Sequence, residues 1–329
     1  MLLVVVEEQA GSLSGGSLEA VSCARELAEG SAEALHAVAF AENTDHAADL
    51  AAPLSKYGVA ALHLLTGEAM AEYCPELWGR AIAELIEHTD ATGLVGPASD
   101  RGNELLAHAA ARTGQPFASN CVAVEPGEVW TLTRLRGGGI LLEDAELSGQ
   151  VRIVSLAQGA VEPVEAATTH EVAVREFTPT LGESLPHSSL AERTSRGSGI
   201  TLATAPVVVS GGRGVGSAEG FAALEELAEL VGGAVGCSRV ATNNGWRPHS
   251  DQVGLTGTKI AADLYIACGI SGATQHWVGC MGAKTILAIN TDPEAPLVSR
   301  ADYAVIGDVH DVLPAVVERV RARREAAAS

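Results

Sequence analysis

The chain has 329 residues, of which 47% are hydrophobic but only 4% aromatic, and it carries a formal net charge of −20 at pH 7. Its length exceeds the roughly 100 to 200 residues of a typical domain, which favours two domains, and its aliphatic composition favours helices packed on parallel sheets. The negative charge argues against nucleic-acid binding, which requires clustered lysine and arginine.

The chain contains no apolar run that approaches the roughly 18 residues of a membrane span, and its N-terminal "MLLVVVEEQ" lacks the basic start of a signal peptide. We therefore expect a cytoplasmic protein without membrane insertion. The six cysteines include no CxxC pair, which favours small buried thiols over disulfides or metal ligands. No metal site is predicted.

Residues 1 to about 124 alternate short β-branched runs with alanine-rich stretches of helical period. Strands are predicted at 2–8, 35–41, 61–66 and 92–98, and helices at 15–30, 48–58, 76–88 and 103–114. This alternation implies a parallel sheet with right-handed crossovers. Ser99 precedes the last of these helices and is predicted to cap it. Strand-like pieces at 128–135, 138–147 and 150–158 then predict an antiparallel hairpin appended to the sheet.

Residues 179–199 are rich in proline, glycine and serine and have no sustained apolar period, which predicts a linker. It would join an N-terminal α/β domain, 1–178, to a second α/β domain, 200–329. In the second domain, strands are predicted at 206–209, 234–236, 264–268, 284–290 and 301–307, and helices at 222–230, from 271 and from 311. The segment 237–258 is long and irregular, which is typical of functional loops.

Two glycine-rich turns in the second domain carry the functional signal, "SGGRGVGS" at 210–217 and "CGISGATQHWVG" at 268–279. Each lies between a predicted strand and a predicted helix, where glycine lets the backbone approach a ligand and the helix N-terminus offers free N–H groups to an anion. The first turn matches neither the dinucleotide fingerprint nor the Walker loop, so a plain tight turn remains its alternative. Two such turns at the carboxyl ends of parallel strands predict a crevice for nucleotide phosphates, with His276 either a ligand or a structural side chain.

The region 206–320 resembles the FAD-binding domain of the α subunit of electron transfer flavoproteins. The stretch "LYIACGISGATQHWVGC" is close to that family's signature, and "SGGRG", "GCSR", "DQVGLTG", "KTILAINTDPEAP" and "ADYAVIGD" occur in the family's order and spacing. A weaker resemblance continues through "LLVVVEE" and "GLVGPASDRGNELLAHAAARTG" in the first domain. The implied fold is α/β with two domains, each with a mainly parallel sheet flanked by helices, the second being a doubly wound FAD-binding domain.

The resemblance implies that FAD is bound in an extended form. Arg239, Thr256 and His276 would tune the flavin, because the guanidinium and the imidazole would stabilise negative charge on its pyrimidine ring and the hydroxyl would bond its nitrogen at position five. A surface ion pair remains the alternative for Arg239. The turn at 271–276 would hold phosphate, and the ends of the next two strands would bind the adenosine portion. The implied FAD contacts are Arg213, Ser238, Arg239, Gln252, Val253, Gly254, Leu255, Thr256, Ser271, Gly272, Ala273, Thr274, Gln275, His276, Asn290, Asp308 and Val309.

The resemblance also implies an electron carrier that works as a heterodimer with a β subunit, which would dock on the N-terminal domain. Electrons would arrive from flavin dehydrogenases, such as the acyl-CoA dehydrogenases of fatty acid oxidation, and leave to a membrane quinone oxidoreductase. Such a carrier needs no catalytic acid or base, because the chemistry belongs to the cofactor. Two alternatives stay open: the α subunit of an electron-bifurcating flavoprotein that oxidises NADH, and a non-redox nucleotide-binding module.

Overall fold

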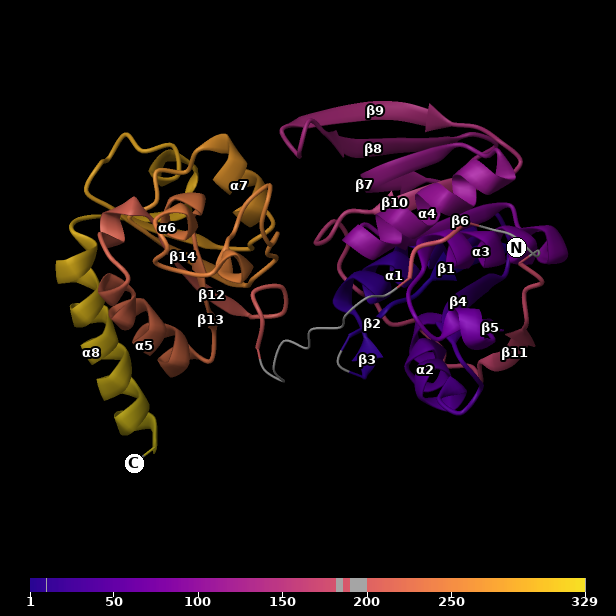
Figure 1. Ribbon diagram of the computed structural model, residues 1–329, viewed down its shortest axis with the longest axis horizontal. Helices are drawn as coiled ribbons and strands as arrows, with labels where there is room; N and C mark the ends of the chain where they lie inside the picture. The colour runs from indigo at the N-terminus through magenta and orange to yellow at the C-terminus, as the bar shows by residue number, and fades with distance from the viewer. Residues whose placement is uncertain (10, 182–185, 190–199, 329) are drawn as a thin grey trace. The chain divides into compact units, whose positions relative to one another are not determined.

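The computed structural model describes residues 1–9, 11–181, 186–189 and 200–328. The chain divides into two compact units, Met1–Arg196 and Gly197–Ser329, and each is described by itself (Figure 1). The predicted linker, 179–199, falls mostly outside the described residues.

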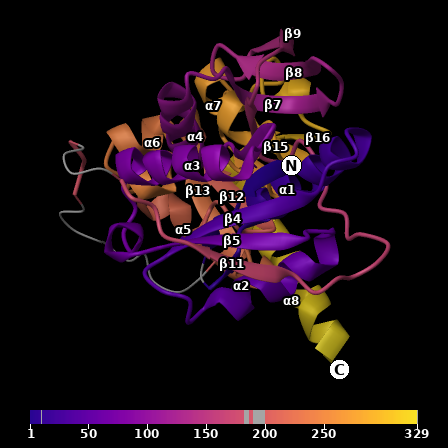
Figure 2. The same cartoon turned by 90° about the vertical axis from the view of Figure 1, so that its right-hand side faces the viewer.

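The first unit is built on one sheet. Its strands are β1 (Leu2–Val5), β4 (Leu35–Ala41), β5 (Ala61–Thr66), β6 (Gly93–Pro97), β7 (Phe117–Glu125), β8 (Trp130–Arg136), β9 (Leu141–Leu147), β10 (Arg152–Leu156) and β11 (Ala173–Phe177). Their order across the sheet is β11-β5-β4-β1-β6-β10-β7-β8-β9. The pairings are parallel except β7 with β8 and β8 with β9, so the antiparallel strands lie toward one edge and β11 forms the other (Figures 1 and 2). A separate ribbon pairs β2 (Glu8–Gln9) with β3 (Ser12–Leu13).

Helices cover both faces of this sheet: α1 (Gly15–Gly30), α2 (Ala47–Leu54), α3 (Pro75–Thr89) and α4 (Asp100–Thr113). Successive side chains of a strand point to opposite faces. Leu2 and Val4 of β1 accordingly pack with α1 and α2, whereas Leu3 and Val5 pack with α3 and α4. The apolar run at the start of the chain is thus a strand buried on both faces, which is typical of parallel sheets.

Most predicted elements of the first unit are confirmed, and β4, β5 and α1 have the predicted bounds. Ser99 caps α4 as predicted, since its Oγ accepts a hydrogen bond from the Gly102 amide at 2.8 Å. The antiparallel prediction is correct for β8 and β9 but wrong for 150–158. That segment forms β10, which lies inside the sheet and pairs in parallel with both β6 and β7. Ile153 and Val154 are completely buried there, as expected of a central strand.

The second unit has a five-stranded sheet within the described residues, parallel throughout. Its strands are β12 (Val207–Gly211), β13 (Ala234–Cys237), β14 (Leu264–Cys268), β15 (Ile286–Asn290) and β16 (Tyr303–Ile306), in the order β13-β12-β14-β15-β16. β13, which follows β12 in the chain, lies on one side of β12, and β14 lies on the other side. This reversal makes a topological switch point between β12 and β14, where a crevice opens at the carboxyl ends of the strands.

Helices flank this second sheet on both faces, which confirms a doubly wound fold. They are α5 (Ala222–Val231), α6 (Arg239–Asn243), α7 (Thr274–Cys280) and α8 (Val309–Ala328). One core joins Leu224 and Leu227 of α5 to Leu313 of α8, and the other joins Tyr265 of β14 to Cys280 of α7. Short 3-10 turns occupy Ser55–Tyr57, Glu68–Met70, Arg213–Val215, Glu219–Phe221, His249–Asp251 and Val298–Arg300.

Two predicted helix starts in the second unit need correction. The helix expected from 271 begins at Thr274, because Ser271, Gly272 and Ala273 remain in the turn. The last helix begins at Val309, two residues before the predicted start. The segment 237–258, predicted to be irregular, contains α6 and one 3-10 turn.

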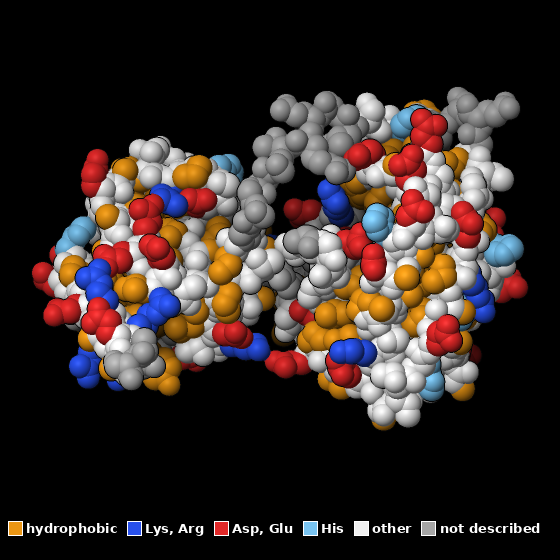
Figure 3. Space-filling model, turned by 90° about the horizontal axis from the view of Figure 1, so that it is seen from below, with side chains coloured by type: hydrophobic (Ala, Val, Ile, Leu, Met, Phe, Trp, Pro, Cys, Tyr) orange, Lys and Arg blue, Asp and Glu red, His pale blue; other side chains and the backbone are white. Residues whose placement is uncertain are grey.

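All six cysteines are buried with free thiols, as predicted. In the part of the chain that the structure describes, none of the helices is both long and apolar enough to cross a membrane. Acidic side chains are spread over the visible faces of both units rather than gathered in one place (Figure 3), which accords with the high formal negative charge.

Candidate functional site

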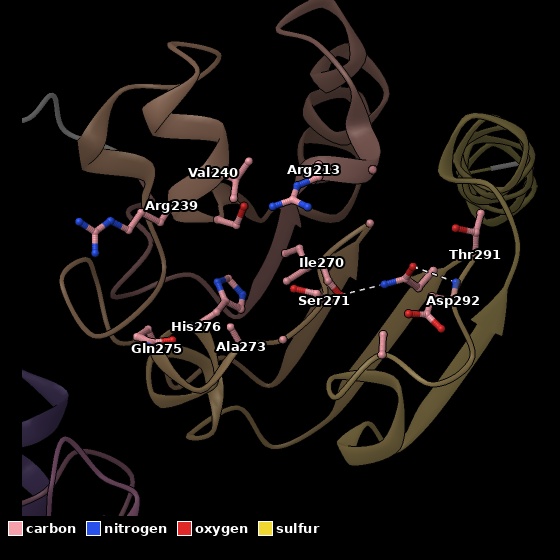
Figure 4. Close-up of a pocket in the computed structure, with 16 residues that line it drawn as sticks. Arg213, Arg239, Val240, Ile270, Ser271, Ala273, Gln275, His276, Thr291 and Asp292 are labelled. Carbon is pink, nitrogen blue, oxygen red and sulfur yellow. Dashed lines mark hydrogen bonds between the residues drawn. The ribbon is translucent and has the colours of Figure 1, made fainter.

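A cavity of about 510 Å³ opens at the carboxyl ends of the strands in the second unit (Figure 4). It is lined by the turns that follow β12, β13, β14 and β15. Its position coincides with the switch point, where ligands bind in open parallel sheets. Its volume lies within the roughly 300 to 1,000 Å³ that is usual for small-molecule sites.

The floor of the cavity is bare backbone, because the two glycine-rich turns pack directly on each other. The Gly212 amide donates to the Cys268 carbonyl at 2.9 Å, and the Gly214 amide donates to the Gly269 carbonyl at 3.0 Å. A Cβ atom on Gly214 would lie 2.7 Å from the Cα of Gly269, and one on Gly269 would lie 2.6 Å from the Cα of Gly214. Gly269 also has a φ of +61°, which disfavours other residues. These glycines therefore serve the contact between the turns, in addition to any close approach of a ligand.

The second turn offers unpaired backbone amides to the cavity. The amides of Ser271, Gly272 and Ala273 have no acceptor among the described residues. Two hydrogen bonds hold this turn in place. The Leu297 amide donates to the Ser271 carbonyl at 3.1 Å. The Asn290 Nδ2 donates to the Ile270 carbonyl at 3.0 Å (Figure 4). Consecutive free amides in a fixed turn form a concave site for an anion.

Two arginines add positive charge to the lining, Arg213 from the first turn and Arg239 from the start of α6. Both are exposed, and neither forms an ion pair with a carboxylate within the described residues. Arg247, in contrast, is bound by Glu225 and Asp251. The alternative of a surface ion pair for Arg239 is thus not met in the described part of the chain. Arg213 reaches over the cavity, whereas the guanidinium of Arg239 extends outward at its rim (Figure 4).

His276 points into the cavity from α7 and is only 8% exposed. Its Nε2 lies 2.7 Å from the hydroxyl of Tyr265, whereas its Nδ1 is buried and has no hydrogen-bond partner in the described protein. Burial lowers the pKa of His276 to about 4, and the Val253 carbonyl acts in the opposite direction. The imidazole is therefore neutral at pH 7, so it can contribute a hydrogen bond to a ligand but not a full charge.

The loop from Gln252 to Thr256 lies against the start of α7, since the Leu255 amide donates to the Gln275 carbonyl at 2.7 Å. Gln252 is 4% exposed, and its side-chain nitrogen and oxygen each form a hydrogen bond. Its Nε2 donates to the Thr256 Oγ1 at 2.9 Å, and its Oε1 accepts from the Thr242 hydroxyl at 3.1 Å. Because its oxygen already accepts from Gln252, the exposed Thr256 hydroxyl keeps its proton available for a ligand.

The chain matches two family models along most of its length. Residues 2–181 match the electron transfer flavoprotein domain, and residues 201–281 match the electron transfer flavoprotein FAD-binding domain. The chain belongs to the electron transfer flavoprotein α-subunit family.

Relatives of this family cover nearly the whole chain. An electron transfer flavoprotein subunit alpha from Mycobacterium tuberculosis is 36% identical over 98% of this chain and 99% of its own length. The protein of the same name from Mycobacterium leprae is 34% identical, covering 98% of both chains. A protein named FixB from Bradyrhizobium diazoefficiens is 32% identical over 97% of this chain and 88% of its own length.

As a member of this family the chain binds FAD, and the residues of the cavity fit that cofactor. The Nδ1 of His276 and the Oγ of Ser238 are buried polar atoms without a hydrogen-bond partner in the described protein, an arrangement that costs about 1 to 3 kcal/mol per group unless a ligand supplies the partner. A flavin dinucleotide offers both carbonyl oxygens and phosphates. The free amides and the guanidinium of Arg213 suit the phosphates.

The structure brings about half of the predicted FAD contacts together in the cavity. The predicted residues that line it are Arg213, Ser238, Arg239, Ser271, Gly272, Ala273, Gln275, His276 and Asn290. The predicted residues outside its lining are Gln252, Val253, Gly254, Leu255, Thr256, Thr274, Asp308 and Val309. The Val253 and Val309 side chains belong to the apolar cores, 1% and 4% exposed, and Asp308 accepts the His310 amide with its Oδ1 at 2.9 Å at the start of α8.

Several lining residues were not among the predicted contacts: Gly214, Val240, Gly269, Ile270, Thr291, Asp292 and Ala295. Most of them adjoin a predicted contact in the chain. The signal that would have found Thr291 and Asp292 is their place directly after the strand that ends at Asn290, since the residues that follow parallel strands line the crevice.

Proposed function

We propose that this protein is the α subunit of a heterodimeric electron transfer flavoprotein and carries electrons on FAD. It takes them from flavin dehydrogenases, such as the acyl-CoA dehydrogenases of fatty acid oxidation, and delivers them to a membrane quinone oxidoreductase, working in the cytoplasm. The observation that carries this proposal is a cavity at the switch point that offers the free amides of Ser271 to Ala273, the unpartnered Nδ1 of His276 and two arginines without an ion pair among the described residues.

In this proposal each part of the site serves one part of the cofactor. The turn from Ser271 to Thr274 and Arg213 hold the diphosphate, because free N–H groups and a guanidinium suit phosphate oxygens. The flavin end is assigned to Ser238, Arg239, Gln275 and His276 with the loop Gln252, Val253, Gly254, Leu255 and Thr256. The adenosine end is assigned to Asn290, Asp308 and Val309.

Bound FAD supplies the electron transfer itself. The residues of this chain set how readily it is reduced, since donors and cations near the flavin favour a form that carries more negative charge. Arg239 contributes a charge, His276 a neutral donor, and Thr256 a hydroxyl proton directed to the flavin nitrogen at position five. These three side chains therefore raise the reduction potential.

Members of this family pair with a β subunit, and we propose that the N-terminal domain, 1–178, is the part that docks it. In this division 179–199 is a linker and 200–329 is the FAD-binding domain. Ile140 and the two leucines that follow it, near the start of β9, are 61% to 67% exposed, and exposed apolar clusters mark interaction surfaces. Replacing Leu141 and Leu142 by serine should weaken copurification with the β subunit. Val174→Ser, at the opposite edge of the sheet and 42% exposed, is the matched control.

The decisive experiment is coexpression with the β subunit, followed by an absorbance spectrum during stepwise reduction with dithionite. The proposal expects a yellow heterodimer with one FAD bound to this chain, reduced by dithionite and by an acyl-CoA dehydrogenase with its substrate. Direct bleaching by NADH would instead favour the bifurcating type. A colourless complex that takes up no added FAD and binds only AMP or ATP would favour a nucleotide-binding module and reject the proposal.

A further inference from the structure

Tyr265 places a polar group inside one of the two cores of the second unit. It lies in the middle of β14, it is completely buried, and its ring packs among apolar residues such as Val208, Ala267 and Cys280. A buried phenol hydroxyl is costly unless it forms a hydrogen bond. The partner here is the Nε2 of His276, at 2.7 Å. The tyrosine thus connects the core to a side chain that lines the cavity.

The direction of this hydrogen bond decides which nitrogen of His276 carries the proton. Burial raises the pKa of Tyr265 well above its usual value, so the phenol keeps its proton and needs an acceptor. A neutral imidazole has one N–H and one acceptor nitrogen. If Nε2 accepts from the phenol, Nδ1 must carry the proton. In the opposite tautomer the phenol proton would turn to the Ser210 hydroxyl, which also lies beside the phenol, and the buried Nδ1 of His276 would be left with an unpaired lone pair.

The groups that line the cavity favour the same tautomer, with the proton on Nδ1. Nδ1 of His276 is buried without a partner in the described protein, and His276 is one of the residues that line the cavity. The lining also offers free turn amides and the guanidinium groups of Arg213 and Arg239, beside one carboxylate, that of Asp292. The amides and guanidinium groups select ligand atoms rich in electrons. An N–H at Nδ1 matches such atoms, whereas a lone pair there would repel them.

We propose that Tyr265 is a positioning residue that holds His276 as a neutral imidazole with its proton on Nδ1, so that this N–H donates into the cavity to an electron-rich atom of the flavin. The role toward the flavin rests on the proposed function. The tautomer itself does not, because it follows from contacts within the second unit. The tyrosine touches neither the cavity nor the cofactor and acts only through the histidine.

The first test measures the tautomer directly. Nitrogen-15 NMR of the labelled heterodimer distinguishes protonated from unprotonated imidazole nitrogens, and a His276→Asn variant identifies the His276 signals among those of the ten histidines. We expect a protonated Nδ1 and an unprotonated Nε2, both in the flavin-free and in the FAD-loaded protein. A proton on Nε2 in the flavin-free protein would overturn the proposal, whether or not FAD binds. Failure to take up FAD would reject the proposed function and leave this result standing.

The second test removes the phenol hydroxyl with Tyr265→Phe, which keeps the ring in the core. The proton should redistribute toward Nε2, and the preference for reduced over oxidised FAD should fall about tenfold, which is about 30 mV for a two-electron couple. Tyr73→Phe is the matched control, because its hydroxyl donates to Glu104 at 2.8 Å in the first unit, and it should change neither quantity.

A double-mutant cycle separates positioning from a general loss of structure. In a His276→Asn background, Tyr265→Phe should have no further effect on the potential. An equal shift in both backgrounds would contradict the positioning role. If the Tyr265→Phe chain does not fold, the tautomer found in the unmodified protein still decides the question.

Discussion

Replacing Gly214 by alanine should push apart the two turns that form the floor of the cavity, which we propose holds FAD. The new Cβ would lie 2.7 Å from the Cα of Gly269, a distance below the 3.0 Å that real Cβ contacts respect. The atom that the new Cβ would meet belongs to the backbone, so the clash cannot be relieved by rotation of a side chain. The turns would have to separate by several tenths of an ångström, which would lengthen the 3.0 Å hydrogen bond from the Gly214 amide to the Gly269 carbonyl. Overpacking of this kind costs about 1 to 3 kcal/mol.

The displacement should reach the ligand, because the free amides of Ser271 to Ala273 follow Gly269 in the same turn. A misplacement of about 1 Å in a binding site can cost about a hundredfold, so a shift of several tenths should weaken FAD binding by about tenfold. The assay is a fluorescence titration of FAD into the flavin-free heterodimer, with urea denaturation to measure the free energy of unfolding.

Gly114→Ala supplies the matched control for Gly214→Ala. Gly114 ends α4 in the first unit with a φ of +66°, and a Cβ there meets nothing within 4 Å. The control should lower the free energy of unfolding by about 1 kcal/mol through backbone strain and leave FAD affinity unchanged. Unchanged affinity in Gly214→Ala, or an equal loss in the control, would refute the reasoning that the contact between the turns shapes the site.

Three further predictions concern charge, hydrogen bonding and pH. Arg239→Gln should lower the FAD midpoint potential by about 30 mV, which is a tenfold loss of preference for the reduced form. Arg247→Gln is the control: it should leave the potential unchanged but lower the free energy of unfolding, because Arg247 binds Glu225 and Asp251. Thr256→Val should lower the potential, and it should also lower stability by about 1 to 3 kcal/mol because the buried Gln252 Nε2 loses its acceptor. An unchanged potential would argue against a hydrogen bond to the flavin. Burial lowers the pKa values of His63 and His276 to about 4, so the unfolded chain takes up protons near pH 6.5 that the folded chain does not. Stability should therefore be full above pH 6.5 and fall between pH 6.5 and 4, by on the order of 3 kcal/mol per histidine; equal denaturation midpoints at pH 7 and pH 5 would contradict this.

Local patterns predicted the elements that carry the site. The helix at 15–30 and the strands at 35–41 and 61–66 have the bounds that their periods indicate. Both glycine turns lie where a strand period ends, and each lines the cavity. These features depend on windows of roughly 11 to 18 residues, in which side-chain spacing and turn residues are sufficient information.

Non-local pairing explains what local patterns missed. The segment 150–158 has the composition of a hairpin strand, yet it lies between β6 and β7 because the chain returns to the centre of the sheet. Neighbouring residues in the sequence likewise do not show that Arg247 is paired while Arg239 has no ion pair in the described part of the chain. Glu225, which binds Arg247, lies 22 residues away in the chain.

The amino-acid sequence by itself determined two α/β units, the place of the crevice between the two glycine turns and the family, because apolar periods, glycine turns and ordered motifs are all local features of the chain. Only the tertiary structure decided that Gly214 faces Gly269, that the amides of Ser271 to Ala273 have no acceptor among the residues described, and that Tyr265 bonds the Nε2 of His276. Each of these depends on how the strands are ordered and how closely their ends approach. Strand order and backbone separation arise from packing the whole unit, and no local period encodes them.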